Sequence, residues 1–276
     1  MTRNPAVLLE TDASIATIRL IDDKRMNPLD DAVIEGMADA IHRVREDKQV
    51  RAVILTGRGR GFSVGADLVH YRRLIDQPGT GGTLGEYVGG LMARMNPIIQ
   101  ALKNLPVPVV CAINGVAAGG GVGLALSGDL VVAAKSAYFY LPFFPSLGAV
   151  PDMGVTWILP RAIGYARTFG LALTGEKLPA QKAQEWGLIW SCVDDDRLEA
   201  ESARLARQLA TMPPHVIGEA RAVFAAAATN TLAQQLDLER ARQMELVNGE
   251  SFFEGARAFS ERRPPDFGSL IRVDAR

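Results

Sequence analysis

Three consecutive glycines, Gly119 to Gly121, occur where an apolar strand is expected to give way to a helix. Glycine is disfavoured inside helices relative to alanine, so such a run is best explained where the backbone must approach another group closely. The first amides of a helix lack partners within the helix, and the helix dipole makes that end slightly positive. The run therefore indicates either a site for negative charge or tight packing of a helix on a sheet, and alone it does not decide between them.

The composition is typical of a cytoplasmic globular protein. The 276 residues are enough for one large domain, or for a domain with a smaller appendage. The formal net charge is -1 and the charges are scattered, so we expect no nucleic-acid partner. Cys111 and Cys192 give neither a disulfide framework nor metal-ligand spacing, and we expect no metal. The first residues lack the pattern of a secretory signal, which favours a cytoplasmic location.

Residues 105–128 are long and apolar enough to imitate a membrane span, with only Asn114 and Ser127 as polar side chains. Pro106, Pro108, Asn114 and the glycine run divide this segment into a short strand, a turn and a helix of small residues. We therefore expect a buried part of the core and no association with a membrane.

The spacing of apolar residues predicts a repeated order of strand, strand and helix. The expected elements are two strands within 6–20, a helix over 29–47, strands at 52–56 and 107–113, a helix from about 120, strands at 130–134 and 138–141, and a helix over 155–170. After Asp194 only helices are expected, over 197–211, 216–228, 232–248 and 252–262. We predict an α/β core over 1–195 and a helical region over 196–276, which packs on the core or on neighbouring subunits.

A second glycine-punctuated turn, GFSVGADL at 61–68, also follows an expected strand. Two converging backbone amides are what a developing oxyanion needs, because fixed donors require no reorganisation as charge develops. Asp67 in this turn is better explained as the cap of the following helix than as a catalytic group. For Glu86 we favour an exposed position at a helix start, for His70 a surface position, and for Gly79 to Gly85 a plain connection in preference to a mobile lid.

Taken together, these segments resemble the crotonase superfamily, the enoyl-CoA hydratases and isomerases. The matching segments are NPLD from 27, VRAVILTGRGRGFSVGADL at 50–68, LPVPVVCAINGVAAGGGVGLALSGDLVVAA at 105–134, LGAVPDMGVTWILPRAIG at 147–164, AQEWGLI at 183–189 and FFEGARAFSERRPPDF at 252–267. The resemblance implies a spiral of β-β-α units with a C-terminal helical trimerisation region. It also implies an acyl-CoA thioester substrate, a homotrimer or dimer of trimers, and no cofactor apart from the coenzyme A of the substrate.

The resemblance also assigns site residues. The backbone amides of Ala66 and Gly120 would form the oxyanion hole around the thioester carbonyl. The coenzyme A moiety and substrate are expected near Lys24, Val64, Asp67, Leu68 and Phe144, with Arg262 reaching over from a neighbouring subunit. Lys24 and Arg262 are equally well explained as solvated surface charges.

Two departures from the family pattern bear on the reaction. Hydratases of the family use two glutamates, and the matching positions here are Gly123 and Phe144. Neither side chain can move a proton, which places hydratase chemistry in doubt. Asp152 in VPDMG matches an aspartate that acts as acid or base in family isomerases, including ring-epoxide phenylacetyl-CoA isomerases. With the segment EWGLIW and Phe144, this makes the phenylacetate-pathway isomerases the nearest resemblance.

Apolar residues near Asp152 in the sequence would raise its pKa if they line the pocket. They are Phe139, Phe143, Phe144, Val150, Met153 and Trp157. The other interpretation of Asp152 is a cap on the helix from Val155. We predict an isomerase in which Asp152 shuttles a proton. The alternatives are a 2-enoyl-CoA hydratase with an unidentified second acid, for which Glu86 is a candidate, a dehalogenase with a nucleophilic Asp152, and an inactive coenzyme A-binding scaffold.

Overall fold

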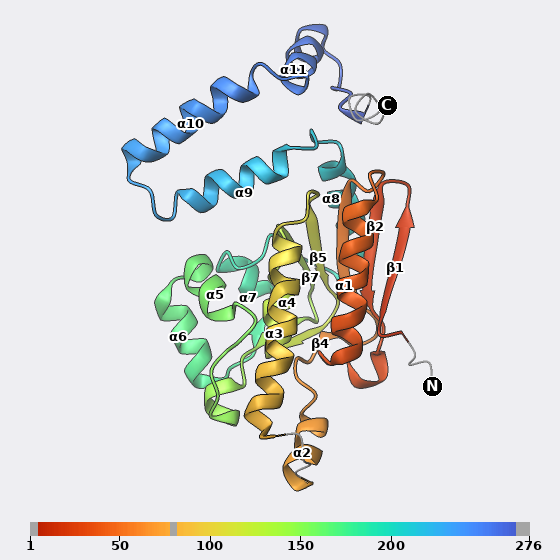
Figure 1. The fold of residues 1–276 in the computed structure, drawn as a ribbon, viewed down its shortest axis with the longest axis vertical. Coiled ribbons are helices and arrows are strands. Elements are labelled where there is room, and N and C mark those ends of the chain that lie inside the picture. The colour runs from red at the N-terminus through yellow and green to blue at the C-terminus, as the bar shows by residue number, and fades with distance from the viewer. Residues whose placement is uncertain (1–4, 78–81, 269–276) are drawn as a thin grey trace. The chain divides into compact units, whose positions relative to one another are not determined.

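A computed structural model of the chain describes residues 5–77 and 82–268 (Figure 1). The chain forms two compact units, Met1–Ala206 and Arg207–Arg276. The division falls inside helix α8 (Leu198–Ala210), whereas the boundary predicted from the sequence, after residue 195, precedes that helix.

The first unit is built on two sheets. The larger has the strand order β1-β2-β3-β5-β7-β10, formed by Val7–Asp12, Ile15–Leu20, Ala52–Gly57, Val109–Ile113, Leu130–Ala134 and Ser191–Val193. The smaller has the order β4-β6-β8-β9, formed by Gly61–Ser63, Val116–Ala118, Tyr138–Tyr140 and Leu178–Pro179. Among the strand pairs of the described residues, only β1-β2 and β8-β9 are antiparallel. The mixed α/β class predicted from the sequence is confirmed.

The predicted repeat of strand, strand and helix is visible in how the strands are shared between the sheets. In the pairs β3-β4, β5-β6 and β7-β8, the first strand joins the larger sheet and the second joins the smaller one. Because β4 and β6 run parallel, with Ser63 opposite Ala117, the turns that follow them leave the same edge of the smaller sheet. The two glycine-rich segments are therefore brought together by strand pairing.

Helix α1 (Asp31–Glu46) covers β1 and β2 with its apolar stripe and also packs against α3 (Leu84–Lys103). Val33, Met37, Ile41 and Val44 are all buried, as their spacing predicts. The helix begins at the cap residue Asp30, whose carboxylate accepts hydrogen bonds from the amides of residues 32 and 33 at 3.1 and 3.2 Å.

As expected, the apolar segment 105–128 contains a strand, β5, and the short helix α4 (Gly120–Ala125), in which every residue is buried. Between them, where a turn was expected, lies a second short strand, β6. No helix within residues 5–77 and 82–268 combines the length and apolar character needed to span a membrane. The three glycines therefore belong to the packed interior of the first unit.

Two expectations need adjustment. The helix predicted over 155–170 is two helices, α5 (Val155–Ile163) and α6 (Tyr165–Thr174). They are separated by Gly164, whose φ of 79° lies in the left-handed region that glycine favours.

The predicted loop from Gly79 lies partly outside the described residues, since 78–81 are not described. Its last residue before α3, Thr83, caps that helix.

The second unit consists of the end of α8 and the helices α9 (Val216–Ala226), α10 (Leu232–Leu246) and α11 (Glu250–Glu261). Arg242 on α10 binds Glu219 on α9 with two hydrogen bonds of 2.8 and 2.6 Å. Phe224, Leu232 and Phe259 are largely exposed. Exposed apolar side chains of this kind are consistent with the predicted trimerisation region, and assembly of the subunits stays a prediction.

Substitution of Gly121 tests the close packing of α4 on β4. A Cβ at this position would lie 2.5 Å from the carbonyl oxygen of Ser63, which is backbone and cannot move aside cheaply. We expect Gly121→Ala to lower the free energy of unfolding by about 1–3 kcal/mol in urea denaturation.

Gly89→Ala on α3 is the matched control, because a Cβ there meets nothing within 4 Å. This control should be neutral or slightly stabilising. Equal stability of the two variants would contradict the packing described here.

Candidate active site

The site begins with two unpaired backbone amides. A Cβ added at Gly65 would lie 3.0 Å from the amide nitrogen of Gly120, so the turn after β4 touches the start of α4. Within the described residues, neither the amide of Ala66 nor that of Gly120 donates a hydrogen bond. Gly119, with φ of 53°, makes the turn into α4. The two predicted oxyanion donors are thus brought into one region with their N–H groups available.

Asn27 fixes the first of these turns, a role that the sequence did not reveal although the motif NPLD was recognised. Asn27 is fully buried with φ of 56°, and its Nδ2 donates to the carbonyls of Arg58 and Gly61 at 3.1 and 2.9 Å. The Ser63 hydroxyl donates to the carbonyl of Asn27 at 2.8 Å. The amide of Leu29 donates to the carbonyl of Gly65 at 2.8 Å. These bonds hold the backbone immediately before Ala66.

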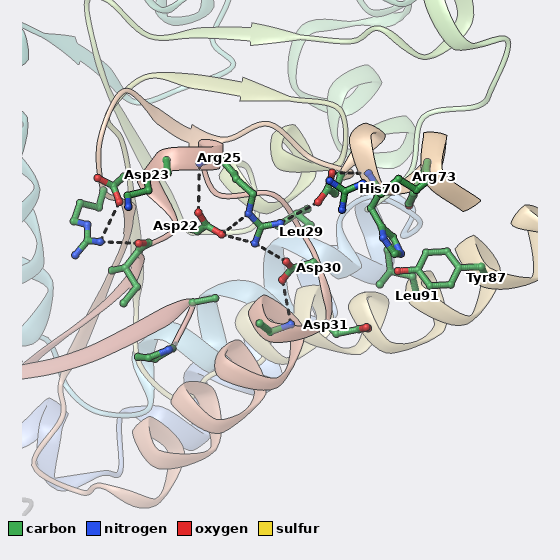
Figure 2. A pocket seen from close by; sticks show the side chains of 18 residues that line it. Asp22, Asp23, Arg25, Leu29, Asp30, Asp31, His70, Arg73, Tyr87 and Leu91 are labelled. Atoms are coloured by element: carbon green, nitrogen blue, oxygen red, sulfur yellow. Dashed lines mark hydrogen bonds and ion pairs between the residues drawn. The ribbon is translucent and has the colours of Figure 1, made fainter. Parts of the chain in front are cut away.

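Asp67 caps helix α2 (Leu68–Asp76), as expected, by accepting a hydrogen bond from the amide of His70 at 2.9 Å. Its other oxygen accepts a hydrogen bond of 2.9 Å from Arg25. Arg25 also binds Asp22 and Asp30, and Figure 2 shows its guanidinium between these two carboxylates. Both carboxylate oxygens of Asp67 therefore accept hydrogen bonds from neighbouring residues, and Arg25 links the oxyanion turn to Asp30 at the start of α1.

The Asp152 carboxylate faces Gly120. Its Oδ1 would lie 3.1 Å from a Cβ added at Gly120. This oxygen is buried and has no hydrogen-bond partner among the described residues. Asp152 does not cap α5, since that helix begins after Gly154 without a side-chain cap. The alternative interpretation of Asp152 as a helix cap is therefore wrong.

Burial raises the pKa of the Asp152 carboxyl to about 6 from an ordinary value of 3.8, opposed by a hydrogen bond from its own backbone. No charged side chain contributes to this shift among the described residues. The carboxylate is thus a stronger base than an ordinary aspartate because it is desolvated and has no cation to stabilise its charge.

Of the six apolar residues predicted to surround Asp152, three are buried and three are exposed. Met153, Phe143 and Phe139 are buried, and Met153 Cγ would lie 3.0 Å from a Cβ at Gly120. By contrast, three side chains of the predicted set are largely exposed, namely Phe144 (41%), Val150 (70%) and Trp157 (59%). Phe144 lies in a π-helical turn, η2 (Phe143–Leu147), and any contact with substrate there stays a prediction.

The position of a hydratase glutamate, Gly123, has no room for a side chain. A Cβ at Gly123 would lie 2.3 Å from the carbonyl oxygen of Met153 and 2.5 Å from its Cβ. The backbone that carries Asp152 and Met153 therefore occupies the space that a glutamate would need. The absence of a glutamate at position 123 and the position of Asp152 therefore both follow from the packing of residues 152 and 153 against α4.

A cavity of about 810 Å³ lies beside the oxyanion turn, lined in part by Lys24, Leu29, Asp67, Tyr71 and Tyr87 (Figure 2). Leu29 connects this cavity to the site, because its Cδ1 would lie 3.4 Å from a Cβ at Gly120.

The remaining predicted binding residues are placed around this cavity or apart from it. Lys24 is exposed and is not engaged in an ion pair within the described residues. Val64 and Leu68 lie on the oxyanion turn and at the start of α2. Arg262 ends α11 in the second unit and is exposed, so its predicted reach to a neighbouring subunit stays a prediction.

Three other side chains differ in how well the sequence anticipated them. Glu86 is held at the start of α3, where its carboxylate accepts a hydrogen bond of 2.6 Å from the amide of Thr83. This agrees with the favoured interpretation. His70 was expected at the surface, but it is half-buried and lines the cavity, with its ring centroid 5.4 Å from that of Tyr87. The sequence analysis also did not predict that Tyr71 lines the cavity, because no recognised motif contains this residue.

The model of the family named enoyl-CoA hydratase/isomerase matches residues 10–270. The chain belongs to this family. It is therefore an enzyme of the crotonase superfamily, whose members act on acyl-CoA thioesters, and the resemblance to its phenylacetate isomerase branch is supported by the relatives below.

Relatives in the family carry names of both reaction types. The chain is 42% identical to the 1,2-epoxyphenylacetyl-CoA isomerase of Escherichia coli, over 95% of this chain and 97% of that protein. It is 30% identical to the trans-2-decenoyl-[acyl-carrier-protein] isomerase of Streptococcus mutans, over 95% and 97% of the two chains. A crystal structure of enoyl-CoA hydratase from Bacillus anthracis superimposes with a TM-score of 0.85 at 30% identity, over 94% and 98%. The fold is therefore that of the crotonase family.

The raised pKa of Asp152 makes the stability of the protein depend on pH. Between pH 3.8 and about 6 the folded protein keeps a proton that the unfolded chain has lost, so the free energy of unfolding falls as pH rises. Asp152→Asn removes this contribution. We expect the variant to be more stable than the wild type at pH 8, by on the order of 1–3 kcal/mol, and the difference to narrow toward pH 5.

The measurement is urea denaturation of both proteins at pH 5, 6, 7 and 8. A difference in the free energy of unfolding that stays constant across this series would contradict an elevated pKa at Asp152.

Proposed function

We propose that the protein is an acyl-CoA isomerase that moves a double bond, or rearranges a ring epoxide, through a thioester enolate. The observation that carries this proposal is the position of a buried Asp152 carboxylate against Gly120: among the described residues its Oδ1 has no hydrogen-bond partner and the amide of Gly120 donates no hydrogen bond. A carboxylate in this position can remove a proton next to a carbonyl whose oxygen is held by backbone amides. The arrangement supplies a base and a stabilised oxyanion together.

In the proposed reaction, Asp152 takes a proton from the carbon beside the thioester carbonyl. The electron pair of the broken C–H bond forms a carbon–carbon double bond, and the carbonyl electrons move to the oxygen. The amides of Ala66 and Gly120 stabilise the resulting enolate. The enolate electrons then re-form the carbonyl while the terminal carbon of the conjugated system takes the proton back from Asp152. The net result is a shifted double bond without loss or gain of atoms.

The electrostatics of Asp152 suit both halves of this cycle. With its pKa raised to about 6 by burial, the carboxyl is mainly ionised at neutral pH and is a stronger base than an ordinary aspartate. Once protonated, it is also a weak enough acid to hold the proton until the enolate can accept it. Ketosteroid isomerase combines an aspartate base with an oxyanion hole in a comparable way.

Hydration of a 2-enoyl-CoA is the alternative, and it requires a second proton-transferring group. Gly123 lacks the space for one, and Phe144 cannot move a proton. Glu86 is exposed and bound to Thr83, which lowers its pKa through the backbone and side-chain hydrogen bonds of that residue. These observations favour isomerisation, which needs one carboxylate, over hydration, which by the family mechanism needs two.

The cavity beside the oxyanion turn supports binding of the coenzyme A moiety. Lys24 supplies a cation at its rim, and Val64 and Leu68 flank the turn. The substrate brings its own coenzyme A, so the proposed reaction uses no additional cofactor. An inactive scaffold protein would bind coenzyme A in the same cavity, but this binding would not depend on Asp152.

Turnover of a 3-enoyl-CoA tests the proposal directly. We expect the protein to form the conjugated 2-enoyl-CoA, seen as an increase in absorbance, and Asp152→Asn to lower kcat/KM by at least about a hundredfold. The wild-type kcat/KM should rise with pH and level off above about 6, because Asp152 must be ionised to act as the base.

Asp39→Asn is the matched control, because Asp39 is an exposed residue of α1 whose one ion pair among the described residues is with Arg43 at 3.7 Å. It should leave turnover unchanged. Activity retained by Asp152→Asn would contradict the mechanism, and rapid hydration of crotonyl-CoA by the wild type would contradict the reaction type.

A further inference from the structure

Two glycines give one face of α4 no side chains, and a single residue packs along this face. Gly120 and Gly123 are three positions apart, so they lie on the same side of the helix. A Cβ at Gly123 would lie 2.5 Å from the Cβ of Met153, and a Cβ at Gly120 would lie 3.0 Å from its Cγ. The buried side chain of Met153 therefore extends along α4 from Gly123 toward Gly120.

The backbone of Met153 adopts a conformation that is uncommon for residues with a side chain. Its φ is 54°, and Gly154 follows with φ of 80°, so two successive residues are left-handed. The amide of Val155 donates to the carbonyl of Asp152 at 3.0 Å and closes this turn. A left-handed residue other than glycine persists where its surroundings hold it, and the contacts with α4 hold Met153. The turn brings the side chains of Asp152 and Met153 to the same end of α4.

Three side chains meet beside Gly120. The position of a Cβ at Gly120 lies 3.0 Å from Met153 Cγ, 3.1 Å from Asp152 Oδ1 and 3.4 Å from Leu29 Cδ1. Met153 and Leu29 are both buried, and so is Asp152 Oδ1, which has no hydrogen-bond partner among the described residues. The two apolar side chains therefore occupy space from which water would otherwise solvate the carboxylate.

We propose that Met153 is a positioning residue for Asp152. Its side chain, together with that of Leu29, excludes water from Oδ1 and fixes the carboxylate beside the amide of Gly120. This inference rests on the proposed isomerase function, and it assigns to one residue the relative placement of the base and the oxyanion donor. Such placement matters, because a shift of about 1 Å in a catalytic group can cost on the order of a hundredfold in rate. Met153 moves no proton itself, since a thioether carries none.

Shortening Met153 would open a site for water next to Asp152. A water molecule there would find an acceptor in Oδ1 and a donor in the amide of Gly120, neither of which is engaged by a described residue. It would stabilise the ionised carboxylate, so the pKa of Asp152 would fall and the base would weaken. It would also compete with the thioester carbonyl for the amide of Gly120.

The charged groups of the surrounding elements do not obscure the titration of Asp152. Helix α4 carries no ionisable side chain. Asp30 and Asp67 are held in ion pairs, and Arg161 of α5 lies over an indole ring at 4.2 Å. None of these three charges contributes to the pKa of Asp152. Burial and, after it, nearby charges that include Asp152 raise the pKa of Tyr71 on α2 to about 12, so this phenol stays neutral below pH 8.

The test measures the pKa of Asp152 in the protein without substrate. The aspartate carboxyls are labelled with 13C and titrated by NMR from pH 4 to 8, and the signal that is absent from Asp152→Asn identifies the residue. The variants are Met153→Ala, Met153→Gln, Met153→Leu and Leu159→Ala. Every replacement at 153 keeps a residue with a Cβ, so the left-handed backbone is matched. Thermal denaturation verifies that each variant is folded.

The pKa of Asp152 should depend on an apolar side chain at 153. We expect it to fall from about 6 toward 3.8 in Met153→Ala, which admits water, and in Met153→Gln, which brings an amide donor to Oδ1. Met153→Leu should keep the wild-type value because it leaves an apolar side chain on α4. Leu159→Ala shortens a buried side chain of α5 and should also keep it.

Turnover gives a second measurement. With a 3-enoyl-CoA, Met153→Ala should lower kcat about tenfold and change KM by less than about twofold, because the base weakens while the coenzyme A cavity is untouched. The pH at which kcat/KM levels off should fall together with the pKa of Asp152. Met153→Leu should restore both values to those of the wild type.

Each other outcome has a definite meaning. A pKa that stays at about 6 in Met153→Ala would overturn the role of Met153, and Met153→Gln decides in the same way if Met153→Ala does not fold. An equal fall in Leu159→Ala or in Met153→Leu would also overturn it, because neither variant opens the space beside Oδ1. If the pKa falls as expected but the wild type converts no 3-enoyl-CoA, the packing role of Met153 stands and the proposed function is overturned.

Discussion

The close approach of two backbone segments is the constraint on which the rest of the site depends. The turn after β4 and the start of α4 come so near that a Cβ at Gly65 would lie 3.0 Å from the amide nitrogen of Gly120. A Cβ at Gly121 would lie 2.5 Å from the carbonyl of Ser63. Only glycine permits this approach, and the parallel pairing of β4 with β6 enforces it. The consequence is two N–H groups, at Ala66 and Gly120, that donate no hydrogen bond to any described residue at this edge of the smaller sheet.

A buried carboxylate oxygen without a hydrogen-bond partner costs stability, and the described part of the chain retains one beside Gly120. Asp152 Oδ1 makes no hydrogen bond with the described residues, and burial raises its pKa to about 6. The backbone of Met153 fills the space next to Gly123, so a second carboxylate from α4 is excluded by packing as well as by the residue present. Residues 152 and 153 therefore supply the base of the proposed mechanism and leave no space for a glutamate at position 123.

Much of this could be predicted from the sequence, because strand and helix periodicity and glycine placement are local signals. The stripe on α1, the capping role of Asp67 and the pairing of the two glycine turns followed from such signals. The place of Tyr71 in the wall of the cavity and the hydrogen bonds of Asn27 could not be predicted, since they depend on which segments meet in space. The exposure of Trp157 was missed because closeness in sequence to Asp152 does not determine which way a helical side chain points.

The central claim is that one carboxylate carries the proton between two carbons of the substrate. Isomerisation in ordinary water of a 3-enoyl-CoA labelled with deuterium at C2 tests this claim, with the label followed by NMR in the 2-enoyl-CoA product. The account predicts that part of the deuterium removed from C2 appears at C4, because a buried Asp152 returns it before full exchange with solvent. A product in which C4 takes up hydrogen from water alone, with no transferred label, would contradict a single-carboxylate shuttle.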